Sequence, residues 1–335
     1  MSGDVSIGVL GLGYWGPNLA RNFGALPGAA VTWLCDGNEA ALDRQRPAHP
    51  RAQTTTDFGD LLADDNLDAV VIAAPVPQHA ELTLAAIEAG KHVFVEKPLG
   101  ATLEEAERVA AAAAASDRVV MVGHLLEYHP AVDKLKSLIA AGELGDIRYI
   151  YSTRLNLGKL RTDENALWSL GPHDVSVALA LIGEEPDEIF AHGEAYMNRG
   201  VEDVVFGYLR FPSGVAAHLH LSWLDPHKQR RITVGGSKRM ATFDDMSVEG
   251  KLTIYDKGFD EKYESYGEYL ARSGDITMPQ IPNEEPLRIE CRHFVECIVK
   301  GEVPRTGAAS GLRTVRVLAG LQGALDAAAE KRLEA

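Results

Sequence analysis

One short stretch decides the fold of this chain: Val5-Ser6-Ile7-Gly8-Val9-Leu10-Gly11-Leu12-Gly13-Tyr14-Trp15-Gly16. Its first half is an apolar run typical of a buried strand, and its second half is a G-x-G-x-x-G motif that leads into a helical pattern. In such a strand–turn–helix, Gly11 permits the tight turn, Gly13 lets the backbone approach a pyrophosphate, and Gly16 permits close packing of helix on strand. The helix N-terminus supplies N–H groups for the phosphates. The stretch therefore predicts a dinucleotide-binding turn, in which Tyr14 and Trp15 also face the cofactor.

An acidic residue follows the second predicted strand, which covers Val31 to Cys35. Asp36 lies about twenty residues after Gly16, where a dinucleotide-binding fold places the acid that hydrogen-bonds the ribose hydroxyls of NAD. A carboxylate at this position repels the 2′-phosphate of NADP. We therefore expect the cofactor to be NAD.

The first 125 residues alternate short apolar runs with helical patterns. Runs that are apolar on both faces, separated by helices, indicate a parallel sheet covered on both sides. The predicted strands are residues 5–10, 31–35, 68–74, 92–95 and 119–122, and the predicted helices are 14–23, a segment from 38 onward, 78–89 and 102–115. Residues 1–125 are thus expected to form an NAD-binding Rossmann domain, an α/β fold with a doubly wound parallel sheet.

The pattern changes near residue 146, where longer strands begin. In the strand predicted at 215–223, Leu219 and Leu221 point one way while His218 and His220 point the other, which indicates a sheet with one face on a core. The other predicted strands are 147–156, 188–195, 204–211, 231–235, 240–244 and 252–255; residues 257–285 are expected to be irregular, and helices return at 287–300 and 308–331. Residues 126–335 are therefore expected to form an α+β domain on a large, mostly antiparallel sheet, for substrate binding and oligomerisation. Its C-terminal helices could pack back on the first domain.

The overall composition narrows the class of protein. The 335 residues include 33 basic and 48 acidic side chains, a formal net charge of −15. So acidic a chain, without a cluster of Lys or Arg, is a poor partner for nucleic acid, and no apolar run reaches the roughly 18 residues of a membrane span. The first residues lead directly into a strand, which predicts no signal peptide. We expect a cytoplasmic protein that binds a small molecule.

The cysteines and histidines show the pattern of neither a disulfide framework nor a metal site. Cys35, Cys291 and Cys297 are odd in number and form no close pair, as in a reducing compartment. His218 and His220 share a strand face, but no carboxylate or cysteine is clustered with them. We expect no metal, and we expect this face to be a polar sheet surface that could join two subunits.

Three polar motifs follow strands of the first domain at their carboxyl ends, where a doubly wound sheet binds its ligand. Pro75 and His79 follow one strand, Glu96 and Lys97 follow the next, and His124 follows the last. Pro75, His79, Glu96 and Lys97 are predicted cofactor contacts. A lysine that is buried beside a cofactor has a lowered pKa and can exchange protons, whereas a lone Glu-Lys pair elsewhere is a solvated surface feature.

Together, these motifs resemble those of the Gfo/Idh/MocA oxidoreductases, which include glucose–fructose oxidoreductase and inositol dehydrogenase. The matching motifs are Gly11 to Gly16, Ala73-Ala74-Pro75 with His79, and Glu96-Lys97-Pro98. The resemblance covers essentially the whole chain and implies that Lys97 is a catalytic and binding residue near the nicotinamide. It also implies a catalytic role for His173, in Trp168-Ser169-Leu170-Gly171-Pro172-His173-Asp174, although Ser169 stands where many relatives have Asp.

A narrower resemblance is to the nucleotide-sugar branch, with its UDP-N-acetylglucosamine and UDP-N-acetylglucosaminuronate 3-dehydrogenases. It is carried by residues 13–18, 168–174, 222–226 and 290–294. It implies oxidation of a sugar C3 hydroxyl with NAD, often before transamination to a 3-amino sugar, by a homodimer or homotetramer. The alternatives are an NAD(P)H-dependent 3-ketoreductase of dTDP-deoxysugars, an inositol or free-sugar dehydrogenase, and a nucleotide-sensing protein without catalysis. The presence of both Lys97 and His173 argues against the sensor.

Oxidation of a secondary alcohol needs a hydride acceptor and a proton acceptor. His173 is the expected base, since histidine has an ordinary pKa near 6.5, and Lys97 would polarise the reacting oxygen or share the proton transfer. Tyr128, Arg154 and Asn156 are further expected substrate contacts, with Lys159 and Arg161 weaker candidates in what could equally be an exposed basic loop.

Overall fold

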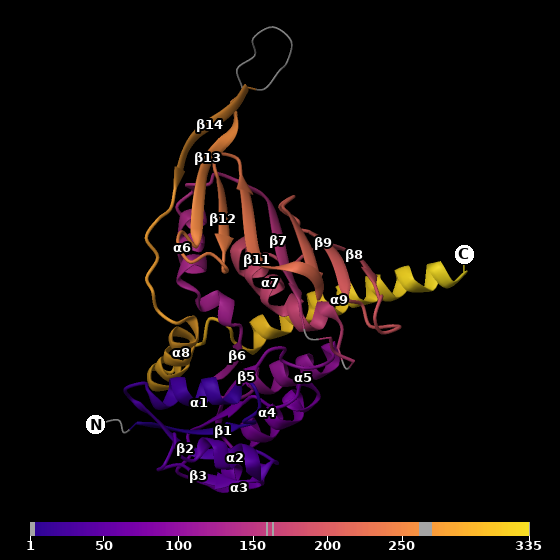
Figure 1. Ribbon diagram of the computed structural model, residues 1–335. Helices are drawn as coiled ribbons and strands as arrows, with labels where there is room; N and C mark the ends of the chain where they lie inside the picture. The colour runs from indigo at the N-terminus through magenta and orange to yellow at the C-terminus, as the bar shows by residue number, and fades with distance from the viewer. Residues whose placement is uncertain (1–3, 159, 163, 261–269, 335) are drawn as a thin grey trace. The chain divides into compact units, whose positions relative to one another are not determined.

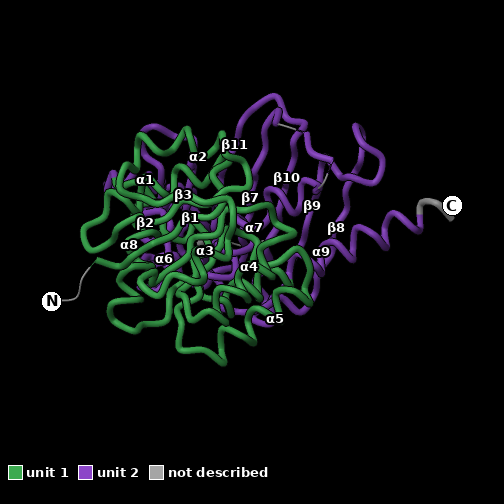
Figure 2. The backbone as a smooth tube through the Cα atoms, turned by 90° about the horizontal axis from the view of Figure 1, so that it is seen from below, with its two compact units in different colours: residues 1–128, 284–316 green, residues 129–283, 317–335 purple. Residues whose placement is uncertain are grey.

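The computed structural model describes residues 4–158, 160–162, 164–260 and 270–334 (Figure 1). The chain divides into two compact units, drawn in green and purple in Figure 2. Unit 1 comprises residues 1–128 and 284–316, and unit 2 comprises residues 129–283 and 317–335. These ranges differ from the expected domains 1–125 and 126–335, because a segment near the C-terminus packs with the first sheet.

Unit 1 is built on a six-stranded sheet in the order β3-β2-β1-β4-β5-β6, in which every pair of neighbours is parallel. The strands are β1 (Val5–Leu10), β2 (Ala29–Cys35), β3 (Gln53–Thr55), β4 (Ala69–Ile72), β5 (His92–Glu96) and β6 (Val120–Gly123). The predicted Rossmann sheet is confirmed, and β3 is an added strand, too short to show a pattern. The strand order reverses between β1 and β4, and a ligand crevice forms at the carboxyl ends beside such a switch point.

The helices of unit 1 begin where the sequence offers a cap. Asn38, Asp57 and Thr102 each accept a backbone N–H in the first turn of the following helix. The helical elements are α1 (Gly16–Gly24), α2 (Glu39–Gln45), α3 (Phe58–Ala63), η1 (Val76–Gln78), α4 (His79–Glu88), α5 (Leu103–Ala114), η2 (Leu125–Tyr128) and α8 (Pro286–Lys300). Helix α1 begins later than predicted, because Tyr14 and Trp15 complete the turn.

Three phenylalanines explain why α8 belongs to unit 1. Phe294 of α8 packs edge-to-face on Phe94 of β5 and on Phe23 of α1, with ring centroids 5.7 and 6.0 Å apart. Phe23 and Phe94 are themselves 5.9 Å apart, and all three rings are fully buried. The helix therefore closes the apolar core of the Rossmann sheet. Helix α9 (Ala308–Glu334) begins in unit 1 and continues in unit 2.

Unit 2 is built on an eight-stranded sheet in the order β14-β13-β12-β11-β7-β10-β9-β8. The strands are β7 (Ile147–Leu157), β8 (Glu188–Glu194), β9 (Val204–Arg210), β10 (Ala216–Ser222), β11 (Leu224–Gly236), β12 (Met240–Asp244), β13 (Leu252–Asp260) and β14 (Leu270–Thr277). Only β7 and β10 pair in parallel, so the predicted mostly antiparallel sheet is confirmed. Helices α6 (Pro130–Ala140) and α7 (Ala166–Ile182) belong to the same unit, together with the second part of α9.

The expectation of irregular structure over 257–285 is wrong for part of that range. Strands β13 and β14 form an antiparallel pair at the sheet edge, in which Lys257 lies opposite Ser273 and Phe259 opposite Ala271 (Figure 1). Most of β14 is exposed, so its sequence lacks the apolar alternation by which a half-buried strand is recognised. Residues 261–269 lie outside the described residues.

One face of this sheet is aromatic and open to solvent. The strand register places Phe190, Tyr208, His218 and Tyr151 in one row across β8, β9, β10 and β7, and it places His192, Phe206 and His220 in the next row. Tyr151 stacks on His218, and Phe206 stacks on His220, with centroids 5.4 and 4.4 Å apart. The phenylalanines and tyrosines of these rows are each more than a third exposed. We call these seven residues the aromatic face.

Candidate active site

The Gly-rich turn between β1 and α1 has the tight geometry that its sequence predicts. Gly11 has φ +89°, and a Cβ there would lie 2.5 Å from the carbonyl oxygen of Ala73, at the end of β4. A Cβ at Gly16 would collide with the carbonyl oxygen of Gly11. At Gly13, by contrast, no described atom lies within 4 Å of the Cβ position. Backbone packing therefore explains the outer glycines, and the middle one leaves room for a ligand to approach.

Asp36 lies beside this turn and hydrogen-bonds to its backbone. Its carboxylate accepts the backbone N–H of Leu12 at 2.6 Å and that of Asn38 at 2.8 Å. The acid at the end of β2 is thus joined to the Gly-rich turn at the end of β1. This is the arrangement that a dinucleotide-binding acid requires.

Tyr14 and Trp15 differ in their surroundings. Tyr14 is 91% exposed, and its ring stacks on that of Trp15 with centroids 6.4 Å apart. Trp15 is half-buried and donates a side-chain hydrogen bond to Glu96 at the end of β5. It is also the N-cap residue of α1 but provides no side-chain hydrogen bond to the helix, among the described residues. The N-terminus of α1, the positive end of the helix dipole, therefore fits an anionic ligand such as a pyrophosphate, although Pro17 has no N–H and that of Asn18 donates to the carbonyl oxygen of Trp15 at 2.9 Å.

Glu96 and Lys97 end β5 as the sequence predicts, and both are half-buried. Burial raises the pKa of the Glu96 carboxyl to about 7, while Lys97 and the hydrogen bonds from the Lys97 N–H and from Trp15 oppose that rise. The peptide bond from Lys97 to Pro98 is cis. A carboxyl group that titrates near neutral pH thus adjoins the lysine, which is the kind of environment found at functional sites.

Two further buried groups, Glu290 and His124, interact electrostatically with this pair, and neither was predicted from the sequence to have a role in the site. Glu290 of α8 is 0% exposed, and neither of its carboxylate oxygens has a hydrogen-bond partner among the described residues. Burial raises its pKa well above the usual value, and Glu96 and Glu127 raise it further. His124 is buried, and neither of its ring nitrogens has a hydrogen-bond partner among the described residues. Burial lowers its pKa to about 3, and the positive charge of Lys97 contributes to this shift. The sequence signals for Glu290 are its place in residues 290–294, which carry part of the family resemblance, and its position on the apolar face of α8, near Leu287 and Phe294.

The structure corrects the role expected of His79. Its side chain is 1% exposed, and its two ring nitrogens lie 2.8 Å from the carbonyl oxygen of Pro98 and 2.9 Å from that of Ala74. The ring therefore joins two turns of the protein and presents no atom to a cofactor. Pro75, in contrast, is exposed at the end of β4.

Tyr128, an expected substrate contact, is enclosed by other side chains of unit 1. Its ring is fully buried in unit 1, and its hydroxyl lies 3.0 Å from Oγ1 of Thr306. The guanidinium of Arg305 lies 4.9 Å from the ring centroid. Burial raises the pKa of the phenol, so the group stays protonated. The sequence placed Tyr128 correctly near the strand ends, but it could not show that Thr306 and Arg305 cover the ring.

In unit 2, Arg154 forms an internal ion pair, and its side chain is not exposed as a substrate contact was expected to be. It is buried on β7, and its guanidinium binds the buried carboxylate of Asp174 on α7. Ser152, also on β7, donates its hydroxyl to the same carboxylate. The pair thereby joins the strand to the helix. The basic residue was visible in the sequence, but its partner twenty positions later on a helix was not.

The other expected substrate residues lie on these two elements. Asn156 is half-buried on β7, and its Oδ1 has no hydrogen-bond partner among the described residues. Ser169 and His173 are half-buried and one helical turn apart on α7, so they share a helix face. Lys159 lies outside the described residues, and Arg161 pairs with Glu164 at 3.0 Å. Lys97 belongs to unit 1 and His173 to unit 2.

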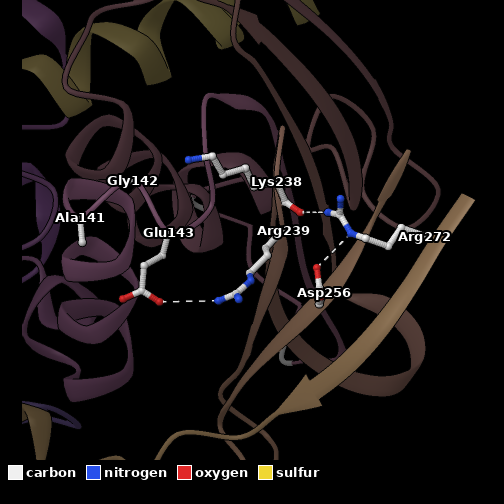
Figure 3. Close-up of a pocket in the computed structure, with 7 residues that line it drawn as sticks. All are labelled: Ala141, Gly142, Glu143, Lys238, Arg239, Asp256 and Arg272. Carbon is white, nitrogen blue, oxygen red and sulfur yellow. Dashed lines mark hydrogen bonds and ion pairs between the residues drawn. The ribbon is translucent and has the colours of Figure 1, made fainter. Parts of the chain in front are cut away.

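A cavity of about 550 Å³ in unit 2 contains none of the predicted site residues. Figure 3 shows its lining, in which Arg272 bonds Asp256 and Arg239 faces Glu143. Its arginines are thus already paired with acids. Among the described residues, no group of three or more His, Cys, Asp or Glu could hold a metal ion, and no helix is long and apolar enough to cross a membrane.

The Rossmann sheet, the Gly-rich turn and the acid at the end of β2 define a dinucleotide-binding protein. Residues 5–124 match the family profile described as "Oxidoreductase family, NAD-binding Rossmann fold", and residues 132–242 match that of the GFO/IDH/MocA C-terminal domain. The chain belongs to the Gfo/Idh/MocA oxidoreductase family. It is therefore an oxidoreductase with an NAD(P)-binding domain.

Relatives within this family differ in substrate. A protein of known structure from Magnetospirillum magnetotacticum is 34% identical, with a TM-score of 0.81 over 96% of this chain and 99% of that chain. The solved UDP-N-acetylglucosamine 3-dehydrogenase of Acidithiobacillus ferrooxidans is 26% identical, with a TM-score of 0.81 over 96% and 98% of the two chains. The scyllo-inositol 2-dehydrogenase (NAD(+)) of Bacillus subtilis is 25% identical over 91% of this chain and 89% of its own.

Proposed function

We propose that the protein is an NAD-dependent dehydrogenase that oxidises the C3 hydroxyl of a nucleotide-linked hexose to a ketone. The observation that carries the proposal is the Gly-rich turn with Asp36, set beside Glu96 and Lys97 at the carboxyl ends of one sheet. The similarity to a UDP-N-acetylglucosamine 3-dehydrogenase supports the nucleotide sugar. A cyclitol is the second candidate, because inositol dehydrogenases are similar over nine-tenths of the chain.

The residues of unit 1 fit a dinucleotide. The open space at Gly13 and the N-terminus of α1, which lacks a side-chain cap among the described residues, would hold the pyrophosphate. The carboxylate of Asp36 would accept the ribose hydroxyls and disfavour NADP. When bound, the nicotinamide supplies the hydride acceptor.

Two side chains carry the proton chemistry in this proposal. His173 accepts the proton of the substrate hydroxyl, and Lys97 donates a hydrogen bond to the oxygen that becomes the ketone. The substrate thereby loses a hydride and a proton, which balances the oxidation of an alcohol. Asn156, with its unpartnered Oδ1, is the proposed contact to a sugar hydroxyl.

The experiment that tests the reaction is a measurement of absorbance at 340 nm with NAD and a panel of UDP- and dTDP-sugars and myo-inositol. We expect turnover of a UDP-hexose. Replacing Lys97 by Met or His173 by Asn should lower kcat by about a hundredfold or more, while Lys134→Met, at an exposed position of α6, should leave it unchanged. Turnover of myo-inositol alone would favour the cyclitol, and NAD binding without any turnover would favour a sensor.

The cofactor preference has its own test. We expect kcat/KM to be higher with NAD than with NADP, and Asp36→Ala should narrow that ratio by about tenfold or more, because the 2′-phosphate no longer meets a carboxylate. Asp65→Ala, an exposed acid after α3, should leave the ratio unchanged. A wild-type preference for NADP would contradict the role of Asp36.

The aromatic face is the proposed subunit interface of a homodimer or homotetramer. Its seven residues include no Asp, Glu, Lys or Arg, whereas the chain as a whole carries a formal charge of −15. Arg210 and Glu188, a surface ion pair 3.9 Å apart, lie at its rim. An aromatic centre with a charged rim is the ordinary anatomy of a protein interface. Two copies of one acidic chain would therefore repel each other least at this face.

A further inference from the structure

One buried histidine connects the two turns that the reaction needs. His79, the first residue of α4, lies 2.8 Å by Nδ1 from the carbonyl oxygen of Pro98 and 2.9 Å by Nε2 from that of Ala74. Pro98 directly follows Lys97. Ala74 follows Ala73, whose carbonyl group abuts Gly11 of the Gly-rich turn and whose N–H donates to Leu10 at 2.8 Å. One ring thus bridges the lysine turn and the turn that supports the cofactor site.

Both neighbours of the ring are acceptors, and this limits what the ring can do. A backbone carbonyl oxygen only accepts hydrogen bonds, while a neutral imidazole has one N–H donor and one acceptor nitrogen. A neutral His79 therefore donates a hydrogen bond to one carbonyl oxygen, while the lone pair of its other ring nitrogen faces a lone pair of the second carbonyl oxygen. The imidazolium form, with two N–H donors, satisfies both.

We propose that His79 is a positioning residue, which sets the place of Lys97 through Pro98 and that of the cofactor turn through Ala74. This inference rests on the proposed function of Lys97. His79 touches neither substrate nor cofactor, since only 1% of its surface is exposed. Its two contacts have different consequences. The Pro98 contact affects the chemical step, and the Ala74 contact affects cofactor binding.

The surroundings of the ring decide when both contacts form. Burial lowers the pKa of His79 below its usual value, and Lys97 lowers it further, while the two carbonyls and Glu105 act in the opposite direction. The N-terminus of α4, where His79 lies, also disfavours a cation. The second contact therefore forms as pH falls below the usual pKa of histidine, and the link between the turns is weaker at alkaline pH.

Two amide variants separate the contacts. The amide nitrogen of Asn lies near the position of Nδ1, and that of Gln lies near the position of Nε2, so His79→Asn keeps a donor for Pro98 and His79→Gln keeps one for Ala74. His79→Met removes both donors at similar size. His49→Gln is the matched control, because His49 is a half-buried histidine of unit 1 whose pKa burial also lowers, and it has no role in the site.

The measurements are the NAD Kd from tryptophan fluorescence, kcat on the sugar alcohol that the protein oxidises, and thermal unfolding. At a pH low enough for both contacts to form, we expect His79→Asn to weaken NAD binding about three- to tenfold with kcat nearly unchanged. His79→Gln should lower kcat about ten- to a hundredfold with the Kd nearly unchanged, and His79→Met should show both losses. As pH rises toward 6.5, the usual pKa of histidine, the wild type should lose NAD affinity more steeply than His79→Gln, whose donor does not titrate.

A purely structural histidine would give a different result. In that case the Asn and Gln variants would change Kd and kcat together, in proportion to their loss of stability, and the proposal would be overturned. Unchanged Kd and kcat in His79→Met would overturn it equally. Full activity of Lys97→Met would instead refute the proposed chemistry, while the NAD Kd of His79→Asn would still test the Ala74 contact.

Discussion

At the scale of single residues, the buried ion pair of unit 2 makes the sharpest prediction. Arg154 and Asp174 are both buried, and each is the other's counter-charge. Arg154→Met removes the counter-charge of the buried Asp174 carboxylate, which keeps the hydrogen bond from the Ser152 hydroxyl. The substitution should therefore lower the free energy of unfolding by about 3–5 kcal/mol. Urea unfolding measures this loss.

The control for this prediction is the double variant Arg154→Met with Asp174→Leu. Replacing a buried pair by apolar groups costs far less than breaking it, so the double variant should be more stable than Arg154→Met alone. If the single variant were as stable as the wild type but lost substrate affinity, Arg154 would be a substrate contact after all.

Glu290 predicts how stability depends on pH. Its pKa is raised well above the usual 4.5 in the folded protein, so the folded chain keeps a proton that the unfolded chain releases. Stability is therefore full below pH 4.5 and falls as pH rises toward the folded pKa, by about 1.4 kcal/mol per pH unit. Glu290→Gln removes this loss, so its free energy of unfolding should exceed that of the wild type increasingly from pH 6 to 9. Parallel curves for the two proteins would show that Glu290 ionises normally.

Individual residues also show where sequence reasoning stops. Gly11, Gly16 and Asp36 were predictable, because each acts on backbone that is near in sequence or fixed by the motif. The structural partners of Arg154 and Tyr128, which are Asp174 and Thr306, were not predictable, because they are distant in sequence. A polar residue near a site is a ligand contact or a structural contact according to groups that only the folded chain brings together.

At the scale of elements, α8 should carry much of the stability of unit 1. Phe294 packs on Phe23 and Phe94 in the core, so Phe294→Ala should lower the free energy of unfolding by about 3–5 kcal/mol. Val299→Ala is the control on the same helix, since Val299 is 58% exposed, and it should change stability by less than about 0.5 kcal/mol. Equal effects of the two substitutions would refute the packing role of α8.

The elements most easily predicted were those buried on one or both faces. Strands β1, β4, β5 and β6 show continuous apolar runs, because helices cover both sides of the parallel sheet. Strand β14 was missed because an exposed edge strand needs no apolar side chains. The sequence allowed the C-terminal helices to pack back on the first domain, but it did not require this of α8, since an amphipathic helix shows which of its faces is buried but not which sheet buries it.

At the scale of the whole molecule, the aromatic face predicts an assembly. Size-exclusion chromatography with light scattering should give a multiple of the single-chain mass. Phe206→Glu should shift it to a single chain, because a buried aromatic anchor contributes about 2 kcal/mol or more and occurs once in each copy of a symmetric pair. The new carboxylates would also face an equally acidic partner.

Val248→Glu, at a position 95% exposed between β12 and β13, adds the same charge away from the aromatic face and should leave the mass unchanged. A wild-type monomer, or an unchanged assembly in Phe206→Glu, would show that copies of this chain do not meet at the aromatic face.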